Sequence, residues 1–453
     1  MKKKLVISLA LFLVFCLSVL GYAGDCSEKG GGKMGSKILE EITLAGSRQG
    51  QSVGFVDVDG DGTADKIVGA PYATSELNLG AVLAYKGDGL GGFSSCPLVL
   101  NGDDNYGFSF VNVRDVDGDG KDDFAVGAIH GDGPDVSLSG SVTVFSGGRN
   151  WNYDEGLGKI IVKLSGEGPM DKFGFSIAAG DLNDDGIGDL IVGAPFNTND
   201  PKFYQGGAVY FYFGPDFADK VALYASSANK GLGWSEATGD INGDNILDLC
   251  ISASGKVLCY YGSQDFQPSI DAPDVVITSS SAGFGKAFTV IGDLDEDGFG
   301  EIVIGAPNAV IDGKRDAGSA YIIRGGEGKR TVNLNAPSSD LIVRIDGADV
   351  FNRFGSSITS IGDEKIDFVV GAPMVDVGLN KLSGKVYLFK GMEISGAATL
   401  VNAVTFEGVT RDQGYGASLA SEKGWLLIGA PRTGSDTGAV DIVDLTASQI
   451  VSE

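Results

Sequence analysis

The chain has 453 residues, 71 of them glycine, and a formal net charge of −26 at pH 7. This length suits either a few ordinary domains or one large repeat architecture with a continuous core. The acidic balance disfavours nucleic acids and anionic membranes as partners and favours cations.

The N-terminus has the pattern of a secretory signal. Three lysines precede an apolar run from Leu5 to Leu20, and Gly21-Tyr22-Ala23 follows. The run is short for a spanning helix, so we predict cleavage after Ala23 and export to the periplasm, the cell surface or the medium. No later segment is apolar enough to insert into a membrane. The predicted segments are the signal peptide (1–23), an N-terminal linker (24–36), a repeat domain (37–445) and a C-terminal tail (446–453).

A unit of roughly 60 residues recurs seven times in the repeat domain. Each unit has a glycine–aromatic pair, an apolar strand ending in Gly-Ala-Pro or a variant, and a later strand opened by glycine. The pairs are Gly54-Phe55, Gly107-Phe108, Phe173-Gly174, Gly233-Trp234, Phe284-Gly285, Phe354-Gly355 and Tyr415-Gly416. The Gly-Ala-Pro elements begin at Gly69, Gly127, Gly193, Ser252 (a degenerate Ser-Ala-Ser), Gly305, Gly371 and Gly429.

Four short apolar segments per unit, separated by turn residues and without helical periodicity, predict an all-β fold. We predict a seven-bladed β-propeller of four-stranded blades. The last unit lacks its fourth strand, whereas an unassigned strand, residues 38–44, precedes the first unit. We expect this N-terminal strand to complete the last blade, because an open array would expose two sheet edges.

Five units carry an acidic loop between their first two strands, with carboxylates or amides at positions 1, 3, 5 and 9. Calcium binds six to eight oxygens, whereas magnesium prefers a tighter octahedral shell. A glycine or asparagine at position 6 permits the left-handed turn that wraps such a loop around an ion. We therefore predict about five Ca2+ ions, one per loop. The predicted ligands, with position 7 contributing its backbone carbonyl, are Asp57, Asp59, Asp61, Thr63 and Asp65; Asp115, Asp117, Asp119, Lys121 and Asp123; Asp181, Asn183, Asp185, Ile187 and Asp189; Asp240, Asn242, Asp244, Ile246 and Asp248; and Asp293, Asp295, Asp297, Phe299 and Glu301.

The sixth and seventh units depart from this pattern. Residues 361–367 are too few for the loop and include Lys365, and residues 421–424 have the composition of a plain hairpin turn. We predict no metal ion in either blade.

The repeated Phe-Gly and Gly-Ala-Pro elements, with Asp-x-Asp-x-Asp-Gly-x-x-Asp between them, resemble the FG-GAP repeats of the integrin alpha-subunit N-terminal propeller. The resemblance covers essentially the whole chain after the signal. It implies that ligand binds to the face of the ring that carries the loops between second and third strands. Similar repeats occur in many exported microbial proteins and beside an enzyme domain in a phospholipase D family, so the resemblance is specific for fold rather than for function. No inserted metal-dependent adhesion domain interrupts a loop here.

We predict no enzymatic activity, because no recognisable catalytic motif is present. His130 is the single histidine and is interpreted as a surface loop residue. The sequence has no Gly-x-Ser-x-Gly elbow, zinc motif or phosphate loop.

The variable loops are expected on the face opposite the acidic loops, since antiparallel connections alternate between the two faces. We predict an exported calcium-binding module for adhesion or recognition that binds a protein or glycan there. An extracellular carbohydrate-active hydrolase or lyase and a structural module of an envelope complex are the alternatives. The candidate ligand-binding residues are Phe196, Asp200, Lys202, Phe203 and Tyr204. Equally, these aromatic side chains could pack their loop onto its own blade.

Four cysteines remain once Cys16 leaves with the signal. Cys250 and Cys259 flank a short turn and could form a disulfide across a hairpin or remain as two buried thiols. A bridge between Cys26 and Cys96 is possible.

Overall fold

The computed structural model describes residues 46–73, 79–89, 92–94, 98–133, 136–148, 159–198, 205–225, 231–362, 367–390, 400 and 403–445. The predicted signal peptide, linker, closing strand (38–44) and C-terminal tail lie outside these residues, as do Cys26 and Cys96. No helix among the described residues is long and apolar enough to cross a membrane.

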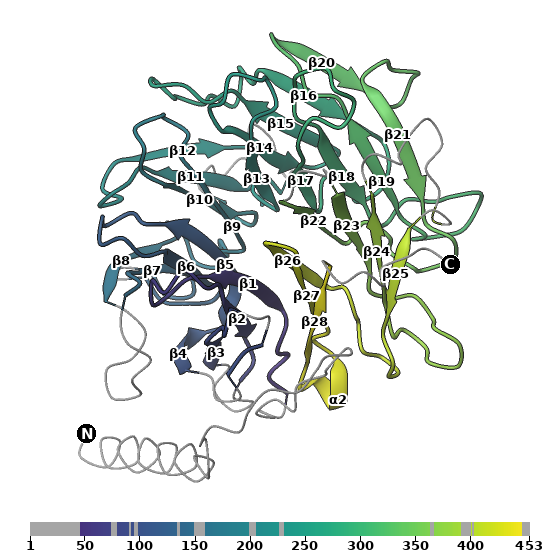
Figure 1. Cartoon of the computed structure of the whole chain (residues 1–453). Coiled ribbons are helices and arrows are strands. Elements are labelled where there is room, and N and C mark those ends of the chain that lie inside the picture. The colour runs from purple at the N-terminus through teal and green to yellow at the C-terminus, as the bar shows by residue number, and fades with distance from the viewer. Residues whose placement is uncertain are drawn as a thin grey trace.

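Seven sheets, numbered here as blades 1 to 7 along the chain, are arranged in a ring (Figure 1), and all their strand pairs are antiparallel except one in blade 4. Blade 1 contains β1 (Ser52–Val56), β2 (Asp65–Ala70), β3 (Leu79–Tyr85) and β4 (Leu98–Asp104). Blade 2 contains β5 (Tyr106–Arg114), β6 (Asp123–Ala128), β7 (Ser141–Phe145) and β8 (Ile160–Ser165). Blade 3 contains β9 (Ser176–Gly180), β10 (Asp189–Ala194), β11 (Ala208–Tyr212) and β12 (Lys220–Tyr224).

The second half of the chain repeats this order with one addition. Blade 4 contains β13 (Glu236–Gly239), β14 (Asp248–Ala253), β15 (Lys256–Tyr260), β16 (Val275–Thr278) and, as a fifth strand, β20 (Arg330–Asn333). Blade 5 contains β17 (Phe288–Val290), β18 (Ile302–Ala306), β19 (Ser319–Ile323) and β21 (Leu341–Asp346). Blade 6 contains β22 (Ser357–Ile361), β23 (Asp367–Ala372), β24 (Lys385–Phe389) and β25 (Val404–Glu407). The described strands of blade 7 are β26 (Ser418–Glu422), β27 (Trp425–Gly429) and β28 (Val440–Asp444), with the short helix α2 (Thr433–Asp436) between the last two.

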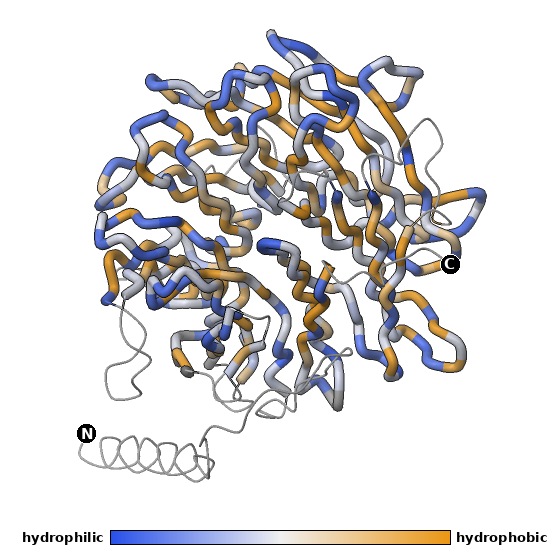
Figure 2. Tube along the Cα trace, viewed as in Figure 1, coloured by the Kyte–Doolittle hydropathy of each residue, from blue (hydrophilic) through white to orange (hydrophobic). Residues whose placement is uncertain are grey.

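The first strand of each blade lies nearest the centre of the ring (Figure 1). The second strands β2, β6 and β10 are buried at every residue, and apolar residues follow the strands while polar ones gather in the connections (Figure 2). Because the strands alternate in direction, the loops between first and second strands lie on one face of the ring. The connections between second and third strands and between blades lie on the other, which we call the variable-loop face.

The glycine–aromatic element of blade 1 is Gln49-Gly50 and not Gly54-Phe55 as predicted. Gly50 has φ +79°, matching Gly107 at +84° and Gly174 at +81°, whereas Gly54 lies inside β1 without a positive φ. The residue before each of these glycines contacts the glycine that opens a third strand, and Gln49 bridges Gly438 in this way. In blade 2 the residue before the glycine is Tyr106, and in blade 4 it is Leu232. The predicted aromatic partners in these two blades, Phe108 and Trp234, follow the glycine instead.

Adjacent blades are joined by a recurring contact between glycines. A Cβ on Gly69 would lie 2.1 Å from the carbonyl oxygen of Gly107 in the next blade, so only glycine fits there. Serine hydroxyls in the first strands donate to the same carbonyls, and we call these the interblade serine bonds. They run from Ser52 to Gly107, Ser109 to Gly174, Ser176 to Gly233, Ser357 to Gly416 and Ser418 to Gly50. The last of these, at 2.7 Å, joins blade 7 to blade 1 and closes the ring.

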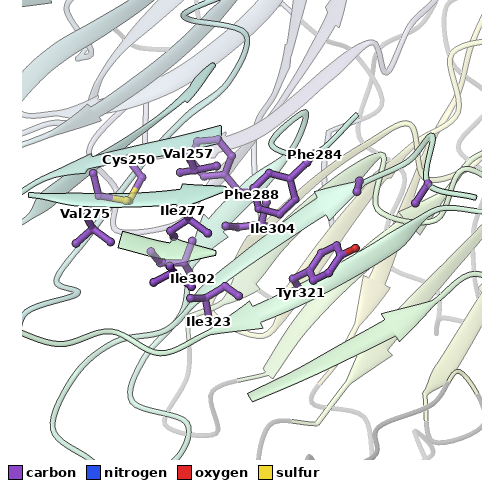
Figure 3. Close-up of a cluster of buried hydrophobic side chains, with 14 of the residues drawn as sticks. Cys250, Val257, Val275, Ile277, Phe284, Phe288, Ile302, Ile304, Tyr321 and Ile323 are labelled. Atoms are coloured by element: carbon purple, nitrogen blue, oxygen red, sulfur yellow. A yellow bond between two sulfur atoms is a disulfide. The ribbon is translucent and has the colours of Figure 1, made fainter. Parts of the chain in front are cut away.

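Blades 4 and 5 are connected differently. Strand β20 leaves the connection between β19 and β21 and pairs in parallel with β16 of blade 4. Tyr261 donates its hydroxyl to the Gly326 carbonyl nearby. One apolar cluster runs through both blades (Figure 3). It includes a disulfide between Cys250 and Cys259, which face each other in the β14–β15 ladder with Cα atoms 4.1 Å apart. The disulfide alternative for these two cysteines is thereby confirmed.

The N-terminal chain meets blade 7 before β1 begins. The Arg48 and Gln49 backbone N–H groups donate to the Asp436 and Thr437 carbonyls. Val53 and Phe55 share a buried cluster with Leu427 and Val440. Blades 1 and 7 are therefore packed together within the described residues.

Candidate metal centres and the opposite face

The five acidic loops share one backbone conformation. In each, the carboxylate at position 1 accepts the N–H of position 6, as Asp57 accepts from Gly62 at 2.7 Å and Asp240 from Asn245 at 2.8 Å. The other three are Gly120 to Asp115, Gly186 to Asp181 and Gly298 to Asp293. These bonds hold the side chains of each loop around a common centre.

Position 6 has the predicted left-handed conformation, with φ +83° at Gly62 and +65° at Asn245. Position 4 is left-handed as well, which the sequence did not reveal because its residues are not all glycine. They are Gly60, Gly118, Asp184, Gly243 and Glu296. Asparagine, aspartate and glycine tolerate this region best.

The acidic side chain at position 9 links two loops of its blade through buried hydrogen bonds. Asp65, Asp123, Asp189 and Asp248 are buried, and each accepts one N–H from position 2 and another from the turn after the third strand. For Asp65 the donors are Val58 at 3.0 Å and Gly87 at 2.8 Å. The corresponding pairs are Val116 with Gly147, Leu182 with Gly214, and Ile241 with Gly262. The predicted ligand at position 9 therefore has a structural role, whether or not it also binds an ion.

Burial raises the pKa of all five position-9 acids: to about 7 for Asp65 and Asp248, to about 6 for Asp123 and Asp189, and to about 8 for Glu301. Neighbouring carboxylates add to the increase, which the backbone N–H donors partly offset. A divalent cation would favour the ionised forms.

Three loops bring several carboxylates together within 4.8 Å of one another. These groups are Asp57, Asp59 and Asp61; Asp115, Asp117 and Asp123; and Asp293, Asp295, Asp297 and Glu301. In the second group Asp115 Oδ1, and in the third Asp295 Oδ1 and Glu301 Oε1, are buried without a hydrogen-bond partner. Buried carboxylate oxygens that lack donors fit a hard cation, so blades 2 and 5 suit calcium best.

Side-chain cations already approach all three of these loops, and in blade 2 Lys121 Nζ lies 3.9 Å from Asp119. Lys86 contacts Asp59 and lies 3.1 Å from Asp61 in blade 1, and Arg324 Nε lies 2.5 Å from Asp295 in blade 5. Both cations come from the first residue after the third strand of their blade. Sequence reasoning missed them, because each lies more than twenty residues beyond its loop and no local spacing marks the contact.

The loops of blades 3 and 4 have asparagine at position 3. The amide of Asn183 donates to Asp185 at 3.1 Å, and that of Asn242 to Asp244 at 3.0 Å. These amides reduce the repulsion between carboxylates without an ion. In blade 7, Glu422 pairs with Trp425 across the expected two-residue hairpin turn. Residues 363–366 of blade 6 are outside the described part of the chain.

On the variable-loop face an aromatic cluster crosses blades 2 to 4. Phe175 lies between Phe108 and Trp234, with ring centroids 5.2 and 4.7 Å away. Phe196, the described member of the predicted ligand-binding set, packs against Phe175 at 6.4 Å and Trp234 at 5.9 Å. It therefore contacts the neighbouring blade as well as its own. Asp200, Lys202, Phe203 and Tyr204 lie outside the described residues.

His130 lies at the same face and is half-buried rather than fully on the surface as predicted. Its Nδ1 is 2.5 Å from Asn105 Oδ1. Burial, and then the charge of Lys172, lower the pKa of His130. The imidazole is therefore neutral at pH 7.

Comparison with known proteins agrees with this architecture. A family model described as FG-GAP repeat matches residues 49–85, 173–212 and 284–323. The chain is 27% identical over 410 residues to the phosphatidylinositol-glycan-specific phospholipase D of Bos taurus, covering 78% of this chain and 47% of that protein. It is 30% identical over 225 residues to the integrin alpha-V of Gallus gallus, covering 46% of this chain and 20% of that protein. The chain thus spans less than half the length of these relatives.

A solved structure, BBS1N in complex with ARL6DN, soaked with lead, has a similar fold. The TM-score is 0.52 at 10% sequence identity, covering 92% of this chain and 97% of that chain. Together, the repeats, the relatives and the seven blades show that the chain is a β-propeller with FG-GAP repeats, similar in sequence to integrin alpha subunits.

Proposed function

We propose that this protein is an exported, calcium-binding β-propeller that binds a protein or carbohydrate ligand through its variable-loop face. The observation that carries the calcium assignment is the set of buried, unpartnered carboxylate oxygens in the clusters of blades 2 and 5. A cation there would compensate charges that the fold otherwise holds close together.

Blades 2 and 5 are the proposed high-affinity sites. The blade 1 loop binds more weakly because Lys86 contacts both Asp59 and Asp61, whereas in blade 5 Arg324 contacts only Oδ2 of Asp295 and leaves Oδ1 without a partner. The loops of blades 3 and 4 offer fewer carboxylates. Isothermal titration of the metal-free chain with calcium tests this order. We expect at least two strong sites that are reduced by Asp115→Asn and by Asp293→Asn, each removing one. Titrations that stay unchanged in both variants would contradict the assignment.

Calcium should also raise the melting temperature, because an ion that binds the folded state alone stabilises it by mass action. A chelator should lower the melting temperature of the same sample, and magnesium should substitute poorly. A melting curve that responds to none of these additions would remove calcium from the proposal.

Recognition is favoured over catalysis because the variable-loop face carries partly exposed aromatic side chains with lysines beside them. Aromatic residues are enriched at protein contact surfaces. An array of glycans and extracellular proteins, probed with the calcium-loaded chain, is the direct test. Mass spectrometry of the bound glycans would reveal the cleavage products expected of a hydrolase or lyase.

Export is supported by the disulfide between Cys250 and Cys259, since such bonds persist in oxidising compartments. Fractionation of cells that express the full chain tests this part. Recovery from the cytoplasm with both thiols reduced would contradict it.

A further inference from the structure

The degenerate repeat of blade 4 leaves a notch on the variable-loop face. In blades 3 and 5, the second and third strands are joined by long connections, residues 195–207 and 307–318. In blade 4, Ser254 and Gly255 alone join β14 to β15. Where the longer loop is missing, a notch of about 240 Å³ lies between blades 4 and 5. Its lining includes Gly231, Trp234, Gly255, Gly283 and Lys286.

Trp234 supplies the aromatic wall of this notch. Its indole is half-buried and is supported from behind by Phe175 and Phe196. The support fixes the ring before any ligand arrives, which lowers the entropic cost of binding. Glycines at 231, 255 and 283 form much of the remaining lining, so a ligand can approach the backbone closely.

The charges beside the notch are mainly positive, although the chain as a whole is strongly acidic. Lys286 is exposed and lies 5.5 Å from the Trp234 ring, and Lys172 lies 4.4 Å from the ring of Phe196. Within the described residues, neither lysine forms an ion pair with a carboxylate. Arg353 is close enough to repel Lys286, and the nearby carboxylate of Asp316 is engaged by Asn308.

We propose that this notch binds an acidic oligosaccharide, with one sugar ring on Trp234 and the anionic group of that sugar at Lys286. The C–H groups of a pyranose face carry partial positive charge and fit the electron-rich surface of an indole. The lysine then meets its counter-charge in the ligand. A neutral glycan would leave the lysines unpaired, and an acidic peptide would offer no flat ring to the indole. The assignment rests on the proposed recognition function and specifies its ligand class.

The test is titration of the full calcium-loaded chain with hexasaccharides. Mannuronate and sulfated heparin hexasaccharides represent carboxylated and sulfated ligands, cellohexaose is the neutral probe, and an oligoaspartate peptide is the acidic peptide probe. We expect one or both acidic sugars to bind at least about tenfold more tightly than cellohexaose and the peptide. Tighter binding of either of the latter would overturn the proposal.

Variants locate the site. Trp234→Ala should weaken the acidic sugar about tenfold and Trp234→Phe less, while Lys286→Gln should weaken it several-fold and reduce its salt dependence. Trp425→Ala and Lys423→Gln, in the blade 7 hairpin on the opposite face, are the matched controls and should bind normally. Melting curves confirm folding, and Trp234→Phe serves if the alanine variant does not fold. Unchanged affinity in the Trp234 and Lys286 variants would overturn the site.

Failure of this inference is distinguishable from failure of the proposed function. If the acidic sugars do not bind but another array ligand does, the ligand class is wrong and recognition stands. If no array ligand binds at all, both are wrong.

Discussion

Glu236 places a buried carboxyl group at a position that is apolar in every other blade. Glu236 lies three residues after Gly233, the glycine of the glycine–aromatic element in blade 4. The residues at the same distance from this glycine in the other blades are Val53, Phe110, Ile177, Phe288, Ile358 and Leu419. Glu236 lies against Gly193 of blade 3, where any added Cβ would collide with its carboxylate. Neither carboxylate oxygen has a hydrogen-bond partner, because the neighbouring Ser176 hydroxyl donates to the Gly233 carbonyl instead. Burial raises the pKa of Glu236 from 4.5 to about 8, and the proximity of Ser176 offsets part of this increase.

This raised pKa makes stability depend on pH in a defined direction. The folded state holds the proton more tightly than the unfolded state, so the contribution of Glu236 is fully present below about pH 4.5 and declines as pH rises towards 8. Each pH unit in this window removes at most about 1.4 kcal/mol. The accumulated cost is therefore about 3 kcal/mol at pH 7 and approaches about 5 kcal/mol above pH 8 as an upper bound.

Glu236→Ile, which copies Ile177 of blade 3, should remove this cost. We expect the variant to be more stable than the parent at pH 8 by about 4 kcal/mol, with the gain shrinking steadily towards pH 5. Urea unfolding at saturating calcium, followed by tryptophan fluorescence between pH 5 and 8, measures the difference. The acidic loops titrate equally in both proteins, so the comparison isolates Glu236.

The exposed Glu327 supplies the control, and Glu327→Gln should show no such trend. A stability difference between Glu236→Ile and the parent that is the same at pH 5 and at pH 8 would refute the reasoning.

Three further substitutions probe the loops and the ring. Lys86→Met should lower the melting temperature in chelator and raise the calcium affinity of the blade 1 loop, because Lys86 and the ion compete for the same carboxylates. Lys423→Met is the control and should change neither quantity. A lower calcium affinity in Lys86→Met would mean that Lys86 does not compete with the ion. Asp123→Asn should destabilise the chain by about 1–3 kcal/mol, because its amide nitrogen cannot accept one of the two buried N–H groups, and a neutral urea midpoint would contradict this role of the side chain. Gly429→Ala should prevent ring closure or lower the melting temperature strongly, since its Cβ would lie 2.2 Å from the Gly50 carbonyl oxygen, while Gly362→Ala, with open space around it, should be tolerated in the same assay.

The repeating parts of this protein could be predicted from sequence because each repeat encodes its conformation locally. The acidic loops need only a few adjacent residues to form, and the turn at Asn245 follows from its tolerance of positive φ. The prediction of the glycine–aromatic pair in blade 1 was wrong because Gln49 replaces the aromatic residue there. Gly54-Phe55, a few positions later, has the expected composition but lies inside β1.

Long-range contacts were not predictable in this way. The pairing of β20 with β16 joins segments more than fifty residues apart, and parallel pairing leaves no turn signal between them. Lys86 and Arg324 reach their loops only after the third strand has folded back. The notch beside Trp234 depends on a loop that blade 4 lacks, so the degenerate Ser-Ala-Ser element was its only sequence signal.

The interblade serine bonds are distributed unevenly around the ring. Among the described residues, no such bond leads from blade 4 to 5 or from blade 5 to 6, where Ala287 occupies the serine position. Strand β20 compensates at the first of these junctions and not at the second. The place where the chain ends meet is held by Ser418 and by the buried cluster of blades 1 and 7. The junction between blades 5 and 6 therefore lacks both a serine bond and an added strand, and it depends on the glycine contact and on the apolar cluster that the two blades share.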